Sequence, residues 1–101
     1  MIVVAGTIPV RPNTWEEAKV LAAHMVEETL KEPGCISYQF HTAASPANTF
    51  FLFEEWESEE ALAAHFKMPH LQNFLKEAPK LLAGALDAKK YTVEKSEPLA
   101  V

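Results

Sequence analysis

The sequence is short of the features that several classes of protein depend on. It has a single cysteine, Cys35, so no disulfide can form within the chain. It shows no signal-peptide pattern and no apolar run of membrane-spanning length, and we therefore expect a cytoplasmic protein that does not enter a membrane. The 14 acidic side chains outnumber the 9 basic ones and leave a net charge of -5. This balance argues against nucleic acid or anionic lipid as a partner.

What the chain does contain is typical of one globular domain. Hydrophobic residues make up 49% of the 101 positions and charged residues 23%, a mixture that disordered chains do not have. A chain of 101 residues is too short to form two hydrophobic cores that are each stable alone. We therefore expect a single domain over residues 1–101.

Four strands are predicted from the apolar and β-branched stretches. They lie at about 2–10, 35–42 and 49–56 and in the closing stretch KKYTVEK. The loop AASPAN, which joins the second and third strands, is rich in turn-forming residues. These two strands should therefore form an antiparallel hairpin.

A first helix is predicted after the first strand. Asn13 or Thr14 can cap its start, and Pro33 and Gly34 stop it. Apolar residues recur at steps of three and four, which indicates that one stripe of the helix faces a core. The members of this stripe are Trp15, Ala18, Ala22, Met25 and Thr29.

Two further helical stretches complete the pattern. Ser58 should cap the first of them, and Pro69 interrupts it. The other runs from about His70 towards Gly84, and Pro79 is expected to bend or break it. The resulting order β-α-β-β-α-β predicts an α+β fold, the ferredoxin-like split βαβ with a four-stranded antiparallel sheet and helices on one face.

The third strand is apolar on both of its faces. In FFLFEEW, Phe50 and Leu52 point to one side of the sheet, and Phe51 and Phe53 point to the other. The helices of so short a chain can cover only one face. We therefore expect a homodimer in which a second copy covers the other face.

Two histidines, His65 and His70, stand close together around Pro69, and a metal site is one interpretation of them. Metal-binding histidines on a helix are usually four residues apart, whereas a spacing of five turns the side chains roughly 140° apart. Pro69 interrupts the helix, so the geometry after it could still bring the two together. The sequence shows no cysteine or carboxylate cluster that would complete a ligand set with them. We therefore expect no metal.

Proton transfer is the second interpretation, and ordinary packing is the third. His65 has the side chain best suited to a base near neutral pH, and Glu54 could orient it. A single helical histidine is nevertheless more often a packing or surface residue. Trp56 and Tyr38 also have core packing as the simpler interpretation.

The motifs of the chain resemble those of the antibiotic biosynthesis monooxygenase domain family, in particular its quinol monooxygenase branch. The resemblance extends from the first strand to the third helix. It rests on EPGCISYQF and FLFEEWESEEALAAHFKMPHLQNF, with Glu32-Pro33-Gly34-Cys35, Tyr38, Glu54, Trp56-Glu57-Ser58, Ala64-His65 and Pro69-His70 as the recurring pieces.

The resemblance implies a dimeric α+β barrel with a cavity for a small phenolic or quinone-like substrate, which reacts with dioxygen without a cofactor. In that setting His65 is the leading base, Tyr38 and His70 are possible donors to the substrate oxygen, Trp56 forms a pocket wall, and Glu54 lies behind these groups.

Other activities of the resembled family fit this sequence less well. Haem-degrading relatives use an asparagine in the first strand, which IVVAGTIPV lacks, and a tryptophan where His65 stands here. Relatives that isomerise phosphorylated compounds would need a phosphate site, and Arg11 is the sole arginine. A small-molecule-binding module without turnover and a cofactor-free isomerase remain the alternatives to a monooxygenase.

Overall fold

A computed structural model describes residues 1–101 and has the predicted order of elements. The elements are β1 (Ile2–Pro9), the short 3-10 helix η1 (Pro12–Thr14), α1 (Trp15–Thr29), β2 (Cys35–Thr42), β3 (Thr49–Trp56), α2 (Glu59–Phe66), α3 (Pro69–Leu81) and β4 (Asp87–Thr92).

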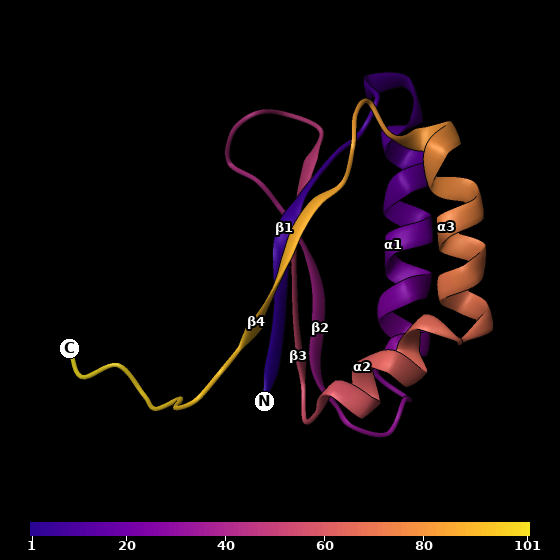
Figure 1. The fold of residues 1–101 in the computed structure, drawn as a ribbon. Helices are drawn as coiled ribbons and strands as arrows, with labels where there is room; N and C mark the ends of the chain where they lie inside the picture. The colour runs from indigo at the N-terminus through magenta and orange to yellow at the C-terminus, as the bar shows by residue number, and fades with distance from the viewer.

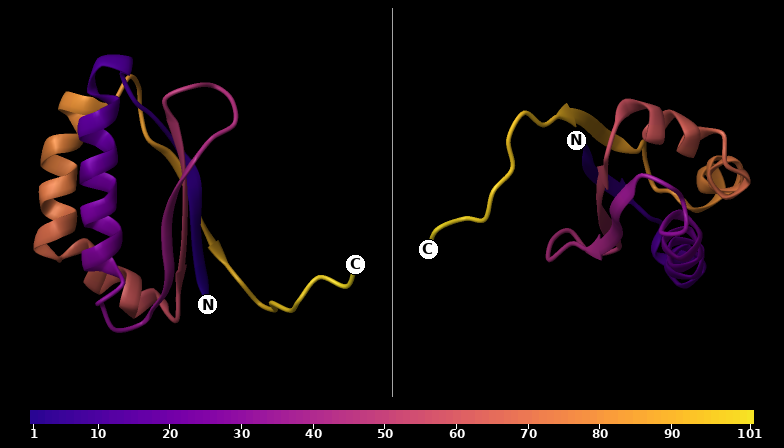
Figure 2. Two further views of the ribbon diagram at one scale, coloured as in Figure 1. Left: turned by 180° about the vertical axis from the view of Figure 1, so that it is seen from behind. Right: turned by 90° about the horizontal axis from the view of Figure 1, so that it is seen from below.

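The four strands form one antiparallel sheet in the order β2-β3-β1-β4. All three α-helices lie on the same face of the sheet, with α1 and α3 side by side (Figures 1 and 2). The predicted α+β, ferredoxin-like fold is confirmed. None of the helices combines the length and the apolar character that a membrane crossing requires.

The helix caps follow the sequence in one case and depart from it in another. Ser58 caps α2, because its Oγ accepts a hydrogen bond of 3.1 Å from the backbone N–H of Ala61. Thr14 occupies the N-cap position of α1 as predicted, but its side chain makes no capping hydrogen bond there. Its hydroxyl instead donates to the carbonyl oxygen of Leu81 at 2.8 Å, and so connects the start of α1 to the end of α3.

The two prolines of the third helical stretch have different effects. Pro69 occupies the first turn of α3, where its missing N–H costs nothing, so α2 and α3 are separate helices. Pro79 was expected to bend or break α3, but the helix continues through it to Leu81. The predicted break at Pro79 was therefore wrong. The helix ends only two residues later, so the backbone hydrogen bond that proline cannot donate is missing only near the last turn.

The hydrophobic core lies between the helices and the face of the sheet that they cover. The alternating residues of β3 that face the helices are buried there, together with the predicted stripe of α1. Phe50 stacks on Trp15 with ring centroids 4.6 Å apart, which joins the start of α1 to the sheet.

The opposite face of the sheet carries no helix (Figure 2). Phe51 on this face keeps 39% of its surface exposed, and the neighbouring Val3, Ala5 and Phe53 are only half-buried. The prediction that both faces are apolar is therefore confirmed, and one apolar face remains uncovered within a single chain.

We propose that a second copy of the chain covers this open face, and we expect a homodimer at micromolar concentration. Sedimentation velocity should give twice the 11.3 kDa mass of one chain. Phe51→Asp places a charge at the centre of the open face and should weaken the dimer by at least about tenfold.

Val20→Asp is the matched control, because Val20 is an exposed apolar residue of α1 on the other side of the molecule. It should leave the dimer intact. A species of 11.3 kDa throughout the micromolar range would contradict the proposed assembly.

Candidate functional site

A tight turn after α1 places Glu32 beside α2. Gly34 has a φ of 84°, which a residue with a side chain rarely adopts, and a Cβ at this position would lie 2.5 Å from the Cβ of Ala61 on α2. The carbonyl oxygen of Gly34 accepts a hydrogen bond of 2.8 Å from the backbone N–H of Glu57. The turn therefore holds the end of α1 close to the start of α2.

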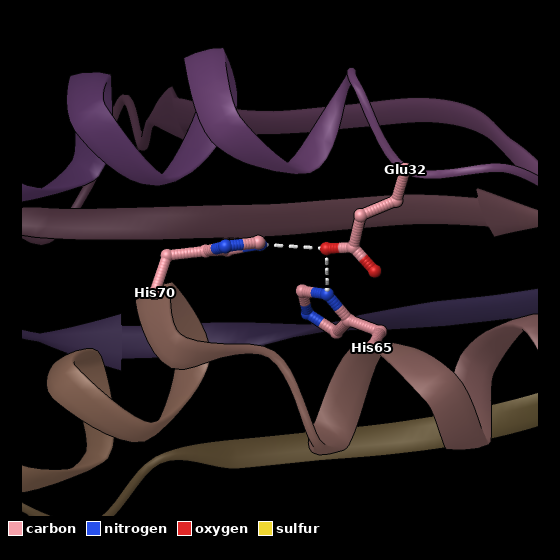
Figure 3. A group of neighbouring side chains, drawn as sticks. All are labelled: Glu32, His65 and His70. Atoms are coloured by element: carbon pink, nitrogen blue, oxygen red, sulfur yellow. Dashed lines mark hydrogen bonds and ion pairs between the residues drawn. The ribbon is translucent and has the colours of Figure 1, made fainter.

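Glu32, His65 and His70 form a compact group at this junction (Figure 3). The Oε2 atom of Glu32 lies 2.7 Å from Nδ1 of His65 and 2.6 Å from Nε2 of His70. The three side chains keep 5%, 3% and 11% of their surface exposed, in that order. One carboxylate oxygen is therefore the meeting point of two imidazole rings that belong to two different helices.

The hydrogen bonds determine which ring nitrogen of His65 remains free. A carboxylate oxygen can only accept, so Nδ1 of His65 donates its hydrogen to Glu32. In the neutral ring Nε2 then carries the lone pair. The same arrangement of carboxylate and imidazole orients the base of many hydrolytic enzymes.

The surroundings of His65 favour its neutral form. The ring of Trp56 lies 4.7 Å from the ring of His65, centroid to centroid, and Tyr38 lies 5.6 Å away. Burial lowers the pKa of His65, although the hydrogen bond to Glu32 opposes this effect. A neutral imidazole with a free Nε2 is suited to accept a proton.

A pocket of about 590 Å³ opens beside His65, between the covered face of the sheet and the helices α2 and α3. Its wall is mainly aliphatic and aromatic, and this size is typical of sites for small organic molecules. Tyr38, Glu54 and His65 are the buried polar residues of the wall. The exposed side chains of Glu59, Lys89 and Lys90 also contribute to it.

Glu54 lies on β3 directly opposite Tyr38 of β2. Its Oε1 accepts a hydrogen bond of 2.8 Å from Nε1 of Trp56. Burial raises the pKa of Glu54 to about 7, the Trp56 bond lowers it, and the charge of Glu32 raises it further. Tyr38 also has a raised pKa, chiefly through burial and then through the charge of Glu54, so it remains a neutral hydroxyl.

The structure divides the five predicted site residues into two groups. Tyr38, Glu54 and His65 line the pocket, whereas His70 binds Glu32 and does not line it. Glu54 was expected behind the site and reaches the pocket itself. The prediction that Trp56 forms a pocket wall was wrong, because its indole is fully buried, packs on His65 and donates to Glu54.

Glu32 is the residue whose role the sequence did not reveal. The resemblance included it only as part of the EPGC motif, and Glu54 was considered as the partner of His65. The contact spans 33 residues, so no local spacing could indicate it. The remaining two histidines, His24 and His41, are exposed and lie outside this group.

The three residues of this group are also the chain's candidate metal ligands, since one ligand atom from each lies within 4.8 Å of the others. The expectation that no carboxylate cluster completes a ligand set with the histidines was wrong, because the Glu32 carboxylate joins them. The new helix that starts at Pro69 brings the two rings together, as the sequence left open. However, two donors at about 2.1 Å from a tetrahedral zinc ion would be roughly 3.4 Å apart. The distances of 2.7 and 2.6 Å to Glu32 are those of hydrogen bonds instead, and the absence of a metal stays a prediction.

The family model described as antibiotic biosynthesis monooxygenase matches residues 1–77 of the chain. An uncharacterized protein of Synechocystis sp. is 39% identical over 98 residues, which cover 97% of this chain and 67% of that protein. A Bacillus subtilis protein with the name "Putative monooxygenase YcnE" is 32% identical over 87 residues, which cover 86% of this chain and 92% of the relative.

Solved structures agree with the fold. The structure of Rv0793 from Mycobacterium tuberculosis superposes with a TM-score of 0.89 at 25% identity, covering 96% of this chain and 98% of that one. The crystal structure named "putative antibiotic biosynthesis monooxygenase" from Deinococcus radiodurans superposes with a TM-score of 0.92 and covers 100% of both chains. At 20% identity this second likeness concerns the fold alone.

Replacing Glu54 should make the stability of the protein less sensitive to pH. Folded Glu54 keeps its proton to about pH 7, whereas unfolded Glu54 loses it near pH 4.5. The folded state therefore binds more protons between these values, and this group lowers the free energy of unfolding as the pH rises. Glu54→Gln cannot titrate, so it should gain up to roughly 3 kcal/mol relative to the natural protein between pH 4.5 and pH 8.

Chemical denaturation at a series of pH values measures this difference. Glu17→Gln, an exposed carboxyl on α1, is the control and should stay within about 0.5 kcal/mol of the natural protein throughout. A Glu54→Gln difference that does not change with pH would show that Glu54 is not a buried titrating group.

Proposed function

The chain belongs to the antibiotic biosynthesis monooxygenase family, and we propose that it oxidises a phenol, quinol or anthrone-like small molecule with dioxygen and without a cofactor. One observation carries this proposal. In a largely apolar pocket, His65 has Nδ1 bound to a buried carboxylate and Nε2 left as a proton acceptor. A base in a dry, apolar site is what the reaction needs from a protein.

The first step is removal of a proton from the substrate. Nε2 of His65 accepts the proton of a phenolic hydroxyl, or of the acidic CH₂ group of an anthrone. Glu32 stabilises the imidazolium that forms, because its carboxylate is already hydrogen-bonded to Nδ1. The lowered pKa of His65 keeps the ring neutral, and so ready to react, at neutral pH.

The electron-rich anion then supplies the reducing power. It passes one electron to dioxygen, and the two radicals combine to form a peroxide on the substrate carbon. The imidazolium of His65 returns its proton to this peroxide, and loss of water then leaves a carbonyl group. One oxygen atom of O₂ ends in the product and the other in water. The CH₂ group of an anthrone, or a ring C–H of a phenol or quinol, becomes C=O, and the reaction balances without a further reductant.

The other pocket residues are suited to hold such a substrate. The apolar wall provides the surface for a flat ring system, and the volume of about 590 Å³ is large enough for one of two or three rings. Tyr38 stays a neutral hydroxyl and can donate to an oxygen of the substrate, where negative charge develops. His70 acts through Glu32 as a positioning residue.

A cofactor-free isomerase is the second candidate function. The pocket holds a neutral histidine and a carboxyl group with a pKa of about 7, and a pair of this kind can move a proton between two positions of a carbonyl compound. Conversion of a substrate under anaerobic conditions would favour this function. Saturable binding with neither oxygen uptake nor conversion would indicate a binding module without turnover.

The role of His65 can be measured with an oxygen electrode over a panel of hydroquinones, naphthoquinols and anthrones. His65→Ala removes the base and should lower turnover by roughly 10² to 10⁴. His65→Gln retains hydrogen bonding without basicity and should be impaired to a similar extent. In the natural protein, activity should rise with pH through the titration of His65 and then level off, because the neutral ring is the active form.

His24→Ala is the control, since His24 is an exposed histidine on α1 outside the pocket, and its turnover should be unchanged. Circular dichroism and sedimentation would establish that each variant is folded. Normal turnover in both His65 variants would leave packing as the better explanation of this residue. Near-normal turnover in His65→Gln alone would mean that another group takes the proton.

A further inference from the structure

Glu54 takes no part in the proposed removal of the first proton, but its carboxyl group can form hydrogen bonds with a ligand. It stands in the middle of β3 with 5% of its surface exposed, and its carboxyl forms part of the pocket wall. Trp56 occupies only Oε1, which leaves Oε2 to the pocket. A buried carboxyl with one held oxygen and one available oxygen is a preorganised hydrogen-bonding group.

No cation of the chain forms an ion pair with this carboxyl; the ion pairs of the structure involve other acids. The other elements around the pocket, β1 and α3, present apolar residues to it. The titratable and charged residues that share the pocket wall with Glu54 are Tyr38 on β2, His65 and Glu59 on α2, and Lys89 and Lys90 on β4, with Glu32 behind His65.

Lys90 is bound to Glu59 at 3.0 Å, and both lysines are exposed to solvent. Because no buried positive charge stabilises the carboxylate, burial governs its titration. The pKa of Glu54 of about 7 means that both protonation states are available near neutral pH.

The two protonation states of Glu54 have opposite hydrogen-bonding character. The carboxylic acid donates a hydrogen bond through its O–H, whereas the carboxylate can only accept. The ligands of the proposed reaction differ in the same respect. A phenol or quinol offers an O–H donor, and the ketone or quinone formed from it offers a carbonyl acceptor.

We propose that Glu54 selects between these two ligand forms: its carboxylate binds the hydroxyl of a phenol or quinol, and its carboxylic acid binds the carbonyl oxygen of the corresponding ketone or quinone. Below about pH 7 the pocket therefore favours carbonyl ligands, and above it the pocket favours hydroxyl ligands. This inference rests on the proposed function for its class of ligand, but binding alone can test it.

A proton balance follows from this selection. A ketone that binds only the acid form takes up a proton whenever Glu54 is ionised beforehand. Its affinity should then fall by up to about tenfold for each pH unit above the titration of Glu54. A phenol that binds the carboxylate should show the opposite dependence and lose affinity as the pH falls below the same point.

Isothermal titration calorimetry with two redox-inert probes measures this directly. 1-Tetralone carries a carbonyl group without a hydroxyl, and 1-naphthol carries a hydroxyl on a ring system of the same size. Between about pH 5.5 and about pH 8 the natural protein should lose at least about tenfold in affinity for 1-tetralone. Its affinity for 1-naphthol should increase over the same range.

Three variants separate Glu54 from the rest of the pocket. Glu54→Gln does not titrate, so its affinity for each probe should be constant across this pH range. Glu54→Asp retains a titrating acid and should keep the pH dependence with weaker binding. Glu17→Gln changes an exposed carboxyl on α1, outside the pocket, and should behave as the natural protein does.

The proposal would be overturned if the natural protein and Glu54→Gln showed the same pH dependence, or if neither probe bound the natural protein at millimolar concentration. Its failure is distinguishable from failure of the proposed function. If the natural protein consumes oxygen but binds both probes independently of pH, the role of Glu54 is ruled out and the proposed function stands. If the probes bind with the expected pH dependence but no substrate of the panel causes oxygen uptake, the monooxygenase reaction is ruled out and the role of Glu54 is supported.

Discussion

The Oε2 atom of Glu32 is the point on which the candidate site depends. It accepts hydrogen bonds from His65 and His70 within a buried environment, and Oε1 of the same carboxylate is buried without a partner. Placing a carboxylate in such surroundings is unfavourable unless strong donors compensate for the lost water. The two imidazole N–H groups supply that compensation, and the turn after α1, the end of α2 and the start of α3 must converge for both to reach it.

The polar groups of the pocket are held from behind by residues that do not line it. Glu32 holds His65, and Trp56 packs on His65 while its indole N–H holds Glu54. His65 and Glu54 therefore share one buried neighbour. This arrangement leaves one free polar atom of each facing a largely apolar volume, the condition under which hydrogen bonds and charges act most strongly on a ligand.

Most of the fold could be predicted from local patterns in the sequence. The alternation of β3, the three- and four-residue repeat of α1 and the cap at Ser58 each depend on neighbouring residues, and the structure confirms them. Thr14 departed from expectation because its hydroxyl bonds to the end of α3, and Pro79 did because the helix ends only two residues after it. The site was predicted only in part. Glu32 is distant in sequence from His65, and the separation of α2 from α3 at Pro69 removed the helical geometry on which the histidine spacing had been judged.

The protonation of the His65 ring tests the central claim most directly. A long-range ¹H–¹⁵N spectrum of uniformly ¹⁵N-labelled protein at neutral pH reports which ring nitrogen carries the hydrogen. We expect Nδ1 of His65 to have the shift of a protonated nitrogen and Nε2 that of an unprotonated one, and Glu32→Met, which removes the acceptor, should abolish this preference. A His65 ring that carries its hydrogen on Nε2, with the same spectrum in Glu32→Met, would contradict the account, because Nε2 could then neither accept the substrate proton nor depend on Glu32.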